Sequence, residues 1–275
     1  METQIKLVAL DLDGTLLSQG ELSPAVGQAV AAVQARGVHV TLATGRRACR
    51  TLPWAKALNI SVPVVAHNGA VVVDPQSGRF CRQQGISLSV ANALIDELVR
   101  LQLPHLVYRG EDQGELGVLA AAFAGHQPEF LTFIDDQLAI ADCISLEVDP
   151  IKIAVLAEAD RMRQVVDTWP HRYGGAVSMV VYQSEGYVGV DIMPPSCSKA
   201  TGIDFILDLL GLDFADVLAI GDDYNDLALI QAAGLGVAMG HAPAAVKQQA
   251  DYIAPTGGQD GVAHVLNRFL LREME

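Results

Sequence analysis

The chain has 275 residues, of which 51% are hydrophobic and 18% are charged, enough apolar material to bury a large core in one or two domains. Its formal net charge of -14 repels nucleic acid and anionic membrane surfaces, so we expect neither as a partner. The apolar runs are short, and neither a membrane span nor a signal peptide is apparent, so we expect a cytoplasmic protein. The cysteines are scattered without a C-x-x-C pair, which disfavours a disulfide framework and a zinc site: Cys49, Cys81, Cys143 and Cys197.

Strands and helices alternate through the first third of the chain. Residues 5–10, which are apolar apart from Lys6, form a run that is typical of a strand buried on both faces. Ser23 as a cap, Pro24 in the first turn and Gly37 at the end predict a helix over the residues between them. The alternation continues with a strand at 38–44, a helix at 46–59 that Pro53 would kink or break, and a strand at 62–70. Repetition of this kind predicts a parallel sheet with helices on both faces.

The same alternation returns towards the C-terminus. We expect helices at 198–211, 224–234, 243–250 and 260–274, and strands at 216–223 and 235–240. The glycine-rich stretch 234–240 is similar to a dinucleotide-binding loop, but that loop must follow a strand and open a helix. Here a helix precedes the stretch, so we expect no dinucleotide cofactor.

The middle of the chain has a different pattern, with longer polar loops between the elements. Strands are expected at 104–109, 151–157, 177–182 and 187–193, and helices at 88–101 and 158–169. We therefore predict an α/β protein with a doubly wound parallel-sheet (Rossmann-like) core formed by residues 1–81 and 192–275. An α+β domain with an antiparallel sheet, residues 82–191, is inserted into this core.

Polar residues follow four of the expected core strands. Asp11 and Asp13 come after the first strand, Thr44 and Gly45 stand at the end of the second, Asn68 stands in the loop that ends the third, and Asp222 with Asp223 come after the apolar run 217–220. Ligands of parallel α/β sheets bind outside the carboxyl ends of the strands, so these groups should share one rim. The spacing of the acids does not fit an EF-hand calcium loop, and the chain lacks a Walker phosphate-binding motif.

Two acids at one strand end can divide the work of phosphoryl transfer. Asp11 would attack phosphorus and form an aspartyl phosphate, while Asp13 would protonate the leaving oxygen and then activate water. The negative charges require a cation, and Mg²⁺ fits because it prefers carboxylates, water and phosphate oxygen. Asp11 and Asp222 are the expected ligands, with the Asp13 carbonyl as a third and Asp226 as either a ligand or an outer partner.

Several further groups could bind the phosphoryl group. Thr44 and the following amides, Gly45 included, would lie at a helix N-terminus that suits an anion. Lys199 stands in the first turn of an expected helix, where a cation opposes the helix dipole, so a functional reason for it is favoured over a solvated lysine. Arg46 is either a further phosphate ligand or an ordinary exposed arginine.

Four motifs in order, DLDGT, ATGR, SKATGI and GDDYND, resemble those of the haloacid dehalogenase superfamily of phosphotransferases. The inserted segment resembles the class IIB cap of the Cof-like subgroup, and HNGA, IKI and DGVA also fit it. The resemblance implies that Asp11 is the nucleophile, that Asp13 is the acid and base, and that Asp222 holds Mg²⁺. It also implies that Thr44 and Lys199 bind the phosphoryl group and that Asn225 contacts phosphate or the metal shell.

Two positions depart from the pattern of the family. His241 stands where the family usually has Asn, and Ala200 where it usually has Gly. Neither change affects a catalytic role, but both could alter the rim of the site. We expect His241 to be a hydrogen-bonding group of this rim.

These residues predict a Mg²⁺-dependent phosphatase for a small phosphorylated metabolite such as a sugar phosphate. A phosphomutase would use the same residues and stays open as an alternative. A receiver-like phosphoacceptor protein is disfavoured, because Asp13 would hydrolyse the phosphoryl group that such a signal must retain. The identity of the metabolite and the oligomeric state are left open.

Overall fold

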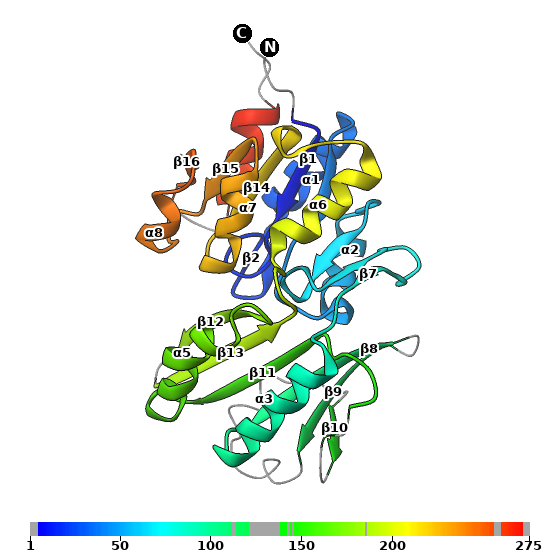
Figure 1. Cartoon of the computed structure of the whole chain (residues 1–275). Coiled ribbons are helices and arrows are strands. Elements are labelled where there is room, and N and C mark those ends of the chain that lie inside the picture. Colours follow the sequence, from blue (N-terminus) through cyan, green and yellow to red (C-terminus); the bar gives the residue numbers. More distant parts are fainter. Residues whose placement is uncertain are drawn as a thin grey trace. The chain divides into compact units, whose positions relative to one another are not determined.

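The computed structural model describes residues 5–111, 114–120, 138–141, 144, 146–184, 186–255 and 260–271 (Figure 1). The chain divides into two compact units. Met1–Arg82 and Ser198–Glu275 together form one of them, here called the core unit, and Gln83–Cys197 form the other, the inserted unit. The second boundary lies later than the predicted residue 191, because the last strand of the inserted unit runs to Met193.

A five-stranded parallel sheet is the centre of the core unit, in the order β16-β15-β14-β1-β4. β1 lies in the middle, where Leu7 pairs with both Val217 and His39. The strands are β1 (Leu7–Leu10), β4 (His39–Leu42), β14 (Val217–Gly221), β15 (Leu235–Ala238) and β16 (Tyr252–Ile253). Every residue of β1 and β14 is buried, as expected for strands covered on both faces.

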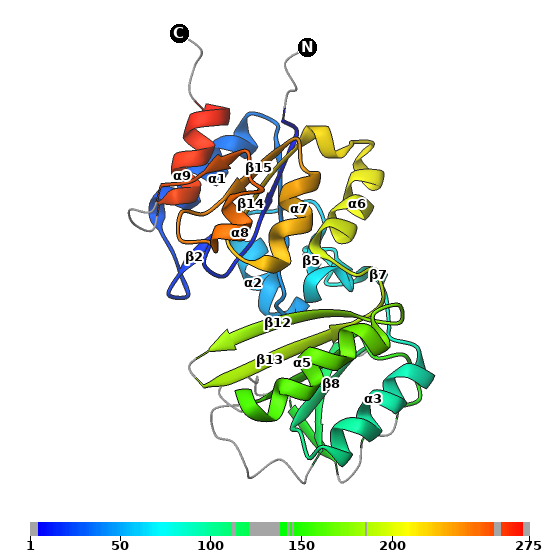
Figure 2. The ribbon, with the colours of Figure 1, turned by 60° about the vertical axis from the view of Figure 1, so that its left-hand side comes forward.

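Helices cover both faces of this sheet (Figure 2). Helices α6 (Lys199–Leu210) and α7 (Leu227–Ala232) pack on one face, and α1 (Pro24–Ala35) and α9 (Gly261–Leu266) lie on the other. This architecture confirms the predicted doubly wound α/β fold. Shorter elements complete the core unit: β2 (Leu17–Ser18), β3 (Glu21–Leu22), η3 (Phe214–Asp216), η4 (Tyr224–Asp226), α8 (Ala244–Lys247) and the π-helical turn η5 (Asn267–Leu271).

The predicted helix ends are present for two helices of the core unit. Ser23 caps α1 through a hydrogen bond that its hydroxyl accepts from the Val26 amide, at 3.2 Å. Ser198 caps α6 in the same way, and Gly211 ends this helix in the left-handed conformation that glycine adopts readily. The first turn of α6, which carries Lys199, is thereby fixed.

The third predicted strand does not simply extend the parallel sheet. β5 (Val64–Ala66) joins it through a single parallel residue pair, Ala43 with Val65, and otherwise forms a separate antiparallel sheet with β6 (Val71–Val73) and β7 (Phe80–Gln83). The turn between β5 and β6 is η1 (His67–Gly69), in which all three residues have positive φ angles. Helix α2 (Ala48–Ala57) continues through Pro53.

A six-stranded sheet forms the inserted unit, in the order β10-β9-β8-β11-β13-β12. Its strands are β8 (His105–Glu111), β9 (Gly114–Ala120), β10 (Leu138–Ala141), β11 (Lys152–Glu158), β12 (Ser178–Ser184) and β13 (Tyr187–Met193). The predicted antiparallel pairing is found for every pair except β9 with β10, which is parallel. A parallel pair needs a longer connection than a hairpin, and residues 121–137 lie between these two strands.

Two helices pack on one face of the inserted sheet, α3 (Leu88–Arg100) and α5 (Ala159–Tyr173). Trp169 on α5 is fully buried in this second apolar core. No helix among the described residues is long and apolar enough to cross a membrane. The structure has no disulfide at any of the three described cysteines, Cys49, Cys81 and Cys197, and Cys143 lies outside the described residues.

Candidate active site

The ends of three parallel core strands open into one cavity. Asp11 directly follows β1, Thr44 follows β4, and Asp222 directly follows β14. Because parallel strands present their carboxyl ends at the same edge of a sheet, these side chains come together as the sequence predicted. The cavity has a volume of about 240 Å³ and a mostly polar lining: Asp11, Asp13, Thr44, Gly45, Arg46, Asp222, Asp223 and Asn225.

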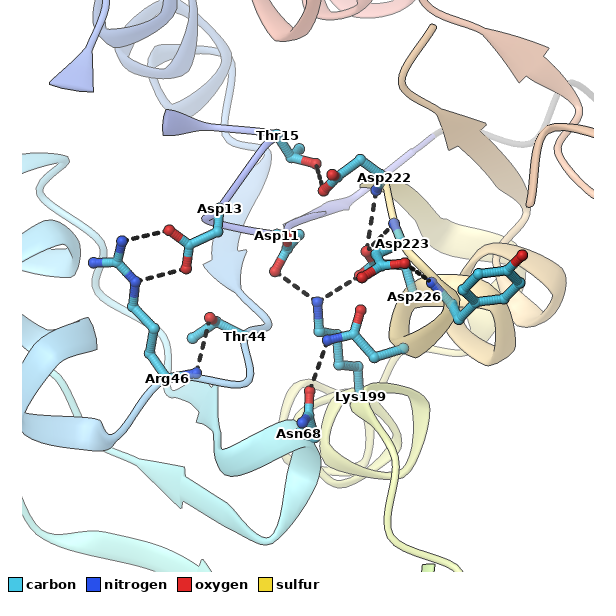
Figure 3. Close-up of polar contacts among 12 residues, drawn as sticks. Asp11, Asp13, Thr15, Thr44, Arg46, Asn68, Lys199, Asp222, Asp223 and Asp226 are labelled. Carbon is cyan, nitrogen blue, oxygen red and sulfur yellow. Dashed lines mark hydrogen bonds and ion pairs between the residues drawn. The ribbon is translucent and has the colours of Figure 1, made fainter. Parts of the chain in front are cut away.

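A fully buried lysine joins two of the acids beneath this cavity (Figure 3). The Lys199 ammonium donates one hydrogen bond to Asp11 Oδ1 at 2.6 Å and another to Asp226 Oδ1 at 2.7 Å. The Lys199 side chain has no exposed surface, and Asp11 and Asp226 are nearly as buried. Charge-assisted hydrogen bonds of this kind are short and strong, so the Asp11 carboxylate is held in one orientation.

The position of Lys199 depends on a close approach between the turn η1 and the start of α6. A Cβ atom added at Gly69 would lie 1.9 Å from the Ser198 carbonyl oxygen, and the φ angle of Gly69 is +102°. Gly202, in the first turn of α6, leaves similarly little room beside Val65. Only glycine permits these contacts, and they bring the Lys199 backbone against the sheet.

Asp222 and Asp226 are fixed by the loop after β14. Thr15 Oγ1 donates a hydrogen bond to Asp222 Oδ1 at 2.9 Å. The Oδ2 atom of Asp226 accepts the backbone N–H groups of Asp222 at 3.1 Å and Asp223 at 3.2 Å. A helix beginning at Asp222 would put Asp226 on the same helix face, but α7 begins only at Leu227, so the Asp226 carboxylate turns back and closes this loop.

The acids of the cluster outnumber its cations. Burial raises the pKa of Asp11 well above its ordinary value, although the Lys199 ammonium lowers it. Burial, followed by the charge of Asp226, also raises the pKa of Asp222. Burial alone would lower the pKa of Lys199, but the carboxylates of Asp11 and Asp226 outweigh it and raise this pKa, so the ammonium form persists. Three acids share one ammonium, and a further cation would relieve the excess negative charge.

The donor set fits a hard divalent cation. Asp11, Asp222 and Asp226 each offer a carboxylate oxygen, and these oxygens lie within 4.8 Å of one another. Ligands that are exclusively oxygen suit Mg²⁺. Both oxygens of Asp226 already accept hydrogen bonds from Lys199 or the backbone, so Asp11 and Asp222 fit as direct ligands and Asp226 fits as their support.

Asp13 lies at the mouth of the cavity, and its side chain is 61% exposed. Arg46 donates two hydrogen bonds to it, from Nε to Oδ2 at 2.7 Å and from Nη2 to Oδ1 at 2.5 Å. This contact raises the pKa of Arg46. Among the described residues, Arg46 is the ion-pair partner of Asp13. The prediction of an ordinary exposed arginine therefore does not describe Arg46.

The other predicted phosphate ligands divide into two groups. Thr44 and Gly45 line the cavity, but α2 begins at Ala48, so they precede the helix and do not form its N-terminus as predicted. Asn68 is buried and does not line the cavity. Its side-chain oxygen accepts a hydrogen bond at 3.0 Å from Asn225, which does line it.

Two contacts of the site were not predicted from the sequence. The hydrogen bond from Thr15 to Asp222 joins the loops after β1 and β14. His241 Nε2 lies 3.4 Å from Asp222 Oδ2, and its side chain is 54% exposed. This position agrees with the rim location expected for His241.

Comparison with known proteins identifies relatives over almost the whole chain. A family model described as haloacid dehalogenase-like hydrolase matches residues 8–266. The chain is 28% identical to the 5-amino-6-(5-phospho-D-ribitylamino)uracil phosphatase YcsE of Bacillus subtilis, and the match covers 98% of both chains.

Solved structures agree with this match. A haloacid dehalogenase-like hydrolase from Bacteroides thetaiotaomicron superposes with a TM-score of 0.80 at 29% identity, covering 96% of this chain and 99% of that one. The subclass IIB sugar phosphatase BT4131 shares the fold with a TM-score of 0.76 at 21% identity, covering 97% of this chain and 100% of that one.

Proposed function

The chain belongs to the haloacid dehalogenase-like hydrolases and is a phosphatase of that family, and from this premise we propose a Mg²⁺-dependent hydrolysis of a small phosphorylated metabolite through an aspartyl phosphate. The observation that carries the proposal is the arrangement of Asp11. This carboxylate lines the polar cavity and is held at 2.6 Å by a fully buried lysine. A nucleophile oriented in this way suits in-line attack on phosphorus.

The first step transfers the phosphoryl group to the enzyme. An Asp11 oxygen attacks phosphorus, the bond from phosphorus to the substrate oxygen breaks, and Asp13 donates a proton to the leaving alcohol. In the second step Asp13 takes a proton from water as the water oxygen attacks phosphorus. The phosphorus–Asp11 bond breaks, inorganic phosphate leaves, and both carboxyl groups return to their starting states.

The remaining groups of the cavity bind and neutralise the phosphoryl oxygens. Thr44 Oγ1, the Gly45 amide and Asn225 provide hydrogen-bond donors at the cavity wall, and Lys199 supplies a positive charge beside Asp11. Asp11 and Asp222 would hold Mg²⁺, with the Asp13 carbonyl as a third ligand. When bound, the ion neutralises charge on the phosphoryl oxygens.

We further propose that the substrate is a sugar phosphate or a similar polyhydroxylated phosphate ester. The names of the relatives support this class, because YcsE acts on a phosphoribityl compound and the subclass IIB neighbour is a sugar phosphatase. The inserted unit, Gln83–Cys197, would select the leaving group, while the core unit handles the phosphoryl group.

Phosphate release from p-nitrophenyl phosphate and from a panel of sugar and polyol phosphates tests this function. We expect turnover that EDTA abolishes and Mg²⁺ restores. Asp11→Asn should lower kcat to the background rate, because the nucleophile is lost, whereas Asp204→Asn removes the same charge from the exposed side of α6 and should retain activity.

Three results would contradict the proposal in different ways. Full turnover in EDTA would exclude the metal, and near-normal kcat in Asp11→Asn would exclude the nucleophile. Conversion of a substrate into its phosphate positional isomer, without phosphate release, would identify a phosphomutase.

A further inference from the structure

The ion pair between Arg46 and Asp13 turns the proposed acid and base towards one wall of the cavity (Figure 3). Both oxygens of the Asp13 carboxylate accept hydrogen bonds from the Arg46 guanidinium, at 2.7 and 2.5 Å. Asp11, which would carry the phosphoryl group, is instead paired with Lys199. The Asp13 carboxylate therefore points towards Arg46, a positively charged residue of the cavity wall.

The backbone on the Arg46 side of the pair is fixed. The Arg46 N–H donates to Thr44 Oγ1 at 3.1 Å, and the Arg46 carbonyl accepts the His67 N–H at 2.8 Å. On the other side, the Gly14 N–H donates to the Leu17 carbonyl at 3.1 Å. Rotation of the two side chains is then sufficient to separate the pair, and both are partly exposed, at 28% for Arg46 and 61% for Asp13.

Arg46 also faces the place where a phosphate must bind. It lines the same cavity as Asp11, Thr44 and Gly45. The planar fork of a guanidinium matches a phosphate as well as a carboxylate, with two parallel hydrogen bonds in either case. A phosphoryl group entering this cavity is thus a second bidentate partner for the same guanidinium.

We propose that Arg46 is a positioning residue that exchanges between two anions, Asp13 in the empty cavity and the phosphoryl group when substrate is bound. The inference rests on the proposed function, because it requires a phosphate ester in this cavity. Arrival of the phosphate releases the Asp13 carboxylate from Arg46. The freed carboxylate takes up a proton from solvent, donates it to the leaving oxygen and regains one from the attacking water, and that last proton returns to solvent when Asp13 pairs with Arg46 again. The acid and base is thus available to the leaving oxygen only when there is a substrate to cleave.

The exchange makes Asp13 and phosphate competitors for one guanidinium. Neutralising Asp13 should strengthen phosphate binding in two ways, by removing a nearby negative charge and by freeing Arg46. Only the second effect requires Arg46, so a double-mutant cycle separates the two. Both side chains are partly exposed, so the substitutions should leave the fold intact.

Binding of inorganic phosphate in the presence of Mg²⁺, measured by titration calorimetry, provides the test. Asp13→Asn should lower the Kd about tenfold more in the natural background than in the Arg46→Met background, which corresponds to about 1.4 kcal/mol of coupling. Lys56→Met removes one positive charge from an exposed position of α2 and should leave the Kd unchanged. Arg46→Lys, which keeps the charge and loses the fork, should raise KM and also lower kcat.

An equal change of the phosphate Kd by Asp13→Asn in the natural and the Arg46→Met backgrounds would overturn the exchange. Normal turnover of the unmodified protein would in that case still support the proposed function. An Arg46→Lys enzyme with unchanged kcat and KM would also overturn it. If the unmodified protein neither bound phosphate nor hydrolysed any ester, the proposed function and the exchange would both be wrong.

Discussion

Asp226→Asn tests whether this carboxylate is a structural support of the core unit. Its two oxygens accept three hydrogen bonds, from the Lys199 ammonium at 2.7 Å and from two backbone N–H groups at 3.1 and 3.2 Å. An asparagine can present its oxygen to only one of these sides, so its NH₂ group must face a donor on the other. Asp226 is 1% exposed, and water cannot replace the lost partner.

The expected loss of unfolding free energy is about 3 kcal/mol. A hydrogen bond to a charged group contributes about 1.5–3 kcal/mol, and the substitution removes the hydrogen bonds that at least one carboxylate oxygen accepts. With a urea dependence of about 2 kcal/mol per molar, the midpoint should fall by about 1.5 M. EDTA in every sample removes any contribution from metal binding.

The two tryptophans of the chain allow the units to be followed separately. Trp54 lies in the core unit and Trp169 in the inserted unit. In a Trp169→Phe background, fluorescence reports the core unit, and Asp226→Asn should shift its transition. In a Trp54→Phe background the transition of the inserted unit should not move. The control Asp204→Asn should shift neither, and a core-unit shift below about 1 kcal/mol would refute the assigned role of Asp226.

Two further predictions concern backbone geometry and pH. Gly69→Ala places a Cβ atom 1.9 Å from the Ser198 carbonyl oxygen, so we expect a stability loss of about 3 kcal/mol and a large fall in kcat. Gly211→Ala is the control, because its added Cβ atom has no neighbouring atom within 4 Å. Its positive φ angle alone should cost only about 1 kcal/mol. Burial lowers the pKa of His105 below its ordinary 6.5, so the unfolded chain binds more protons than the folded chain once the pH falls to this value. The stability of the inserted unit should therefore be complete well above pH 6.5 and fall as the solution is acidified through it. Trp169 fluorescence in urea at pH 7.5 and 5.5 should show this loss, and an undiminished pH dependence in His105→Gln would contradict the assignment.

The sequence predicts the catalytic rim because the information is local. Asp11 and Asp222 each directly follow a short, continuously apolar run, and the α/β alternation requires that such runs end at the same sheet edge. The caps at Ser23 and Gly211 are local in the same sense. These features need no knowledge of which strand lies beside which.

Features that depend on contacts between distant segments were not predictable. Residues 64–66 have the composition of a buried strand, and nothing in them distinguishes a sixth parallel strand from the hairpin that they form with β6. The pairing of Arg46 with Asp13 joins two loops 33 residues apart and leaves no periodic pattern. For Asp226, the sequence left open whether it is a ligand or an outer partner, because the turn η4 determines where its carboxylate points.

The order of the strands in the core sheet has a consequence for synthesis on the ribosome. The central strand β1 emerges first, but its partner β14 follows only after the whole inserted unit, as the pairing of Leu7 with Val217 shows. At a translation rate of about 5–20 residues per second, one edge of β1 waits on the order of 10–40 s for this partner. An apolar strand with an unpaired edge is prone to pair with other chains. The nascent protein should therefore depend on binding by chaperones during this interval. The inserted unit, whose strands all lie in one uninterrupted segment, can fold while the core unit is still incomplete.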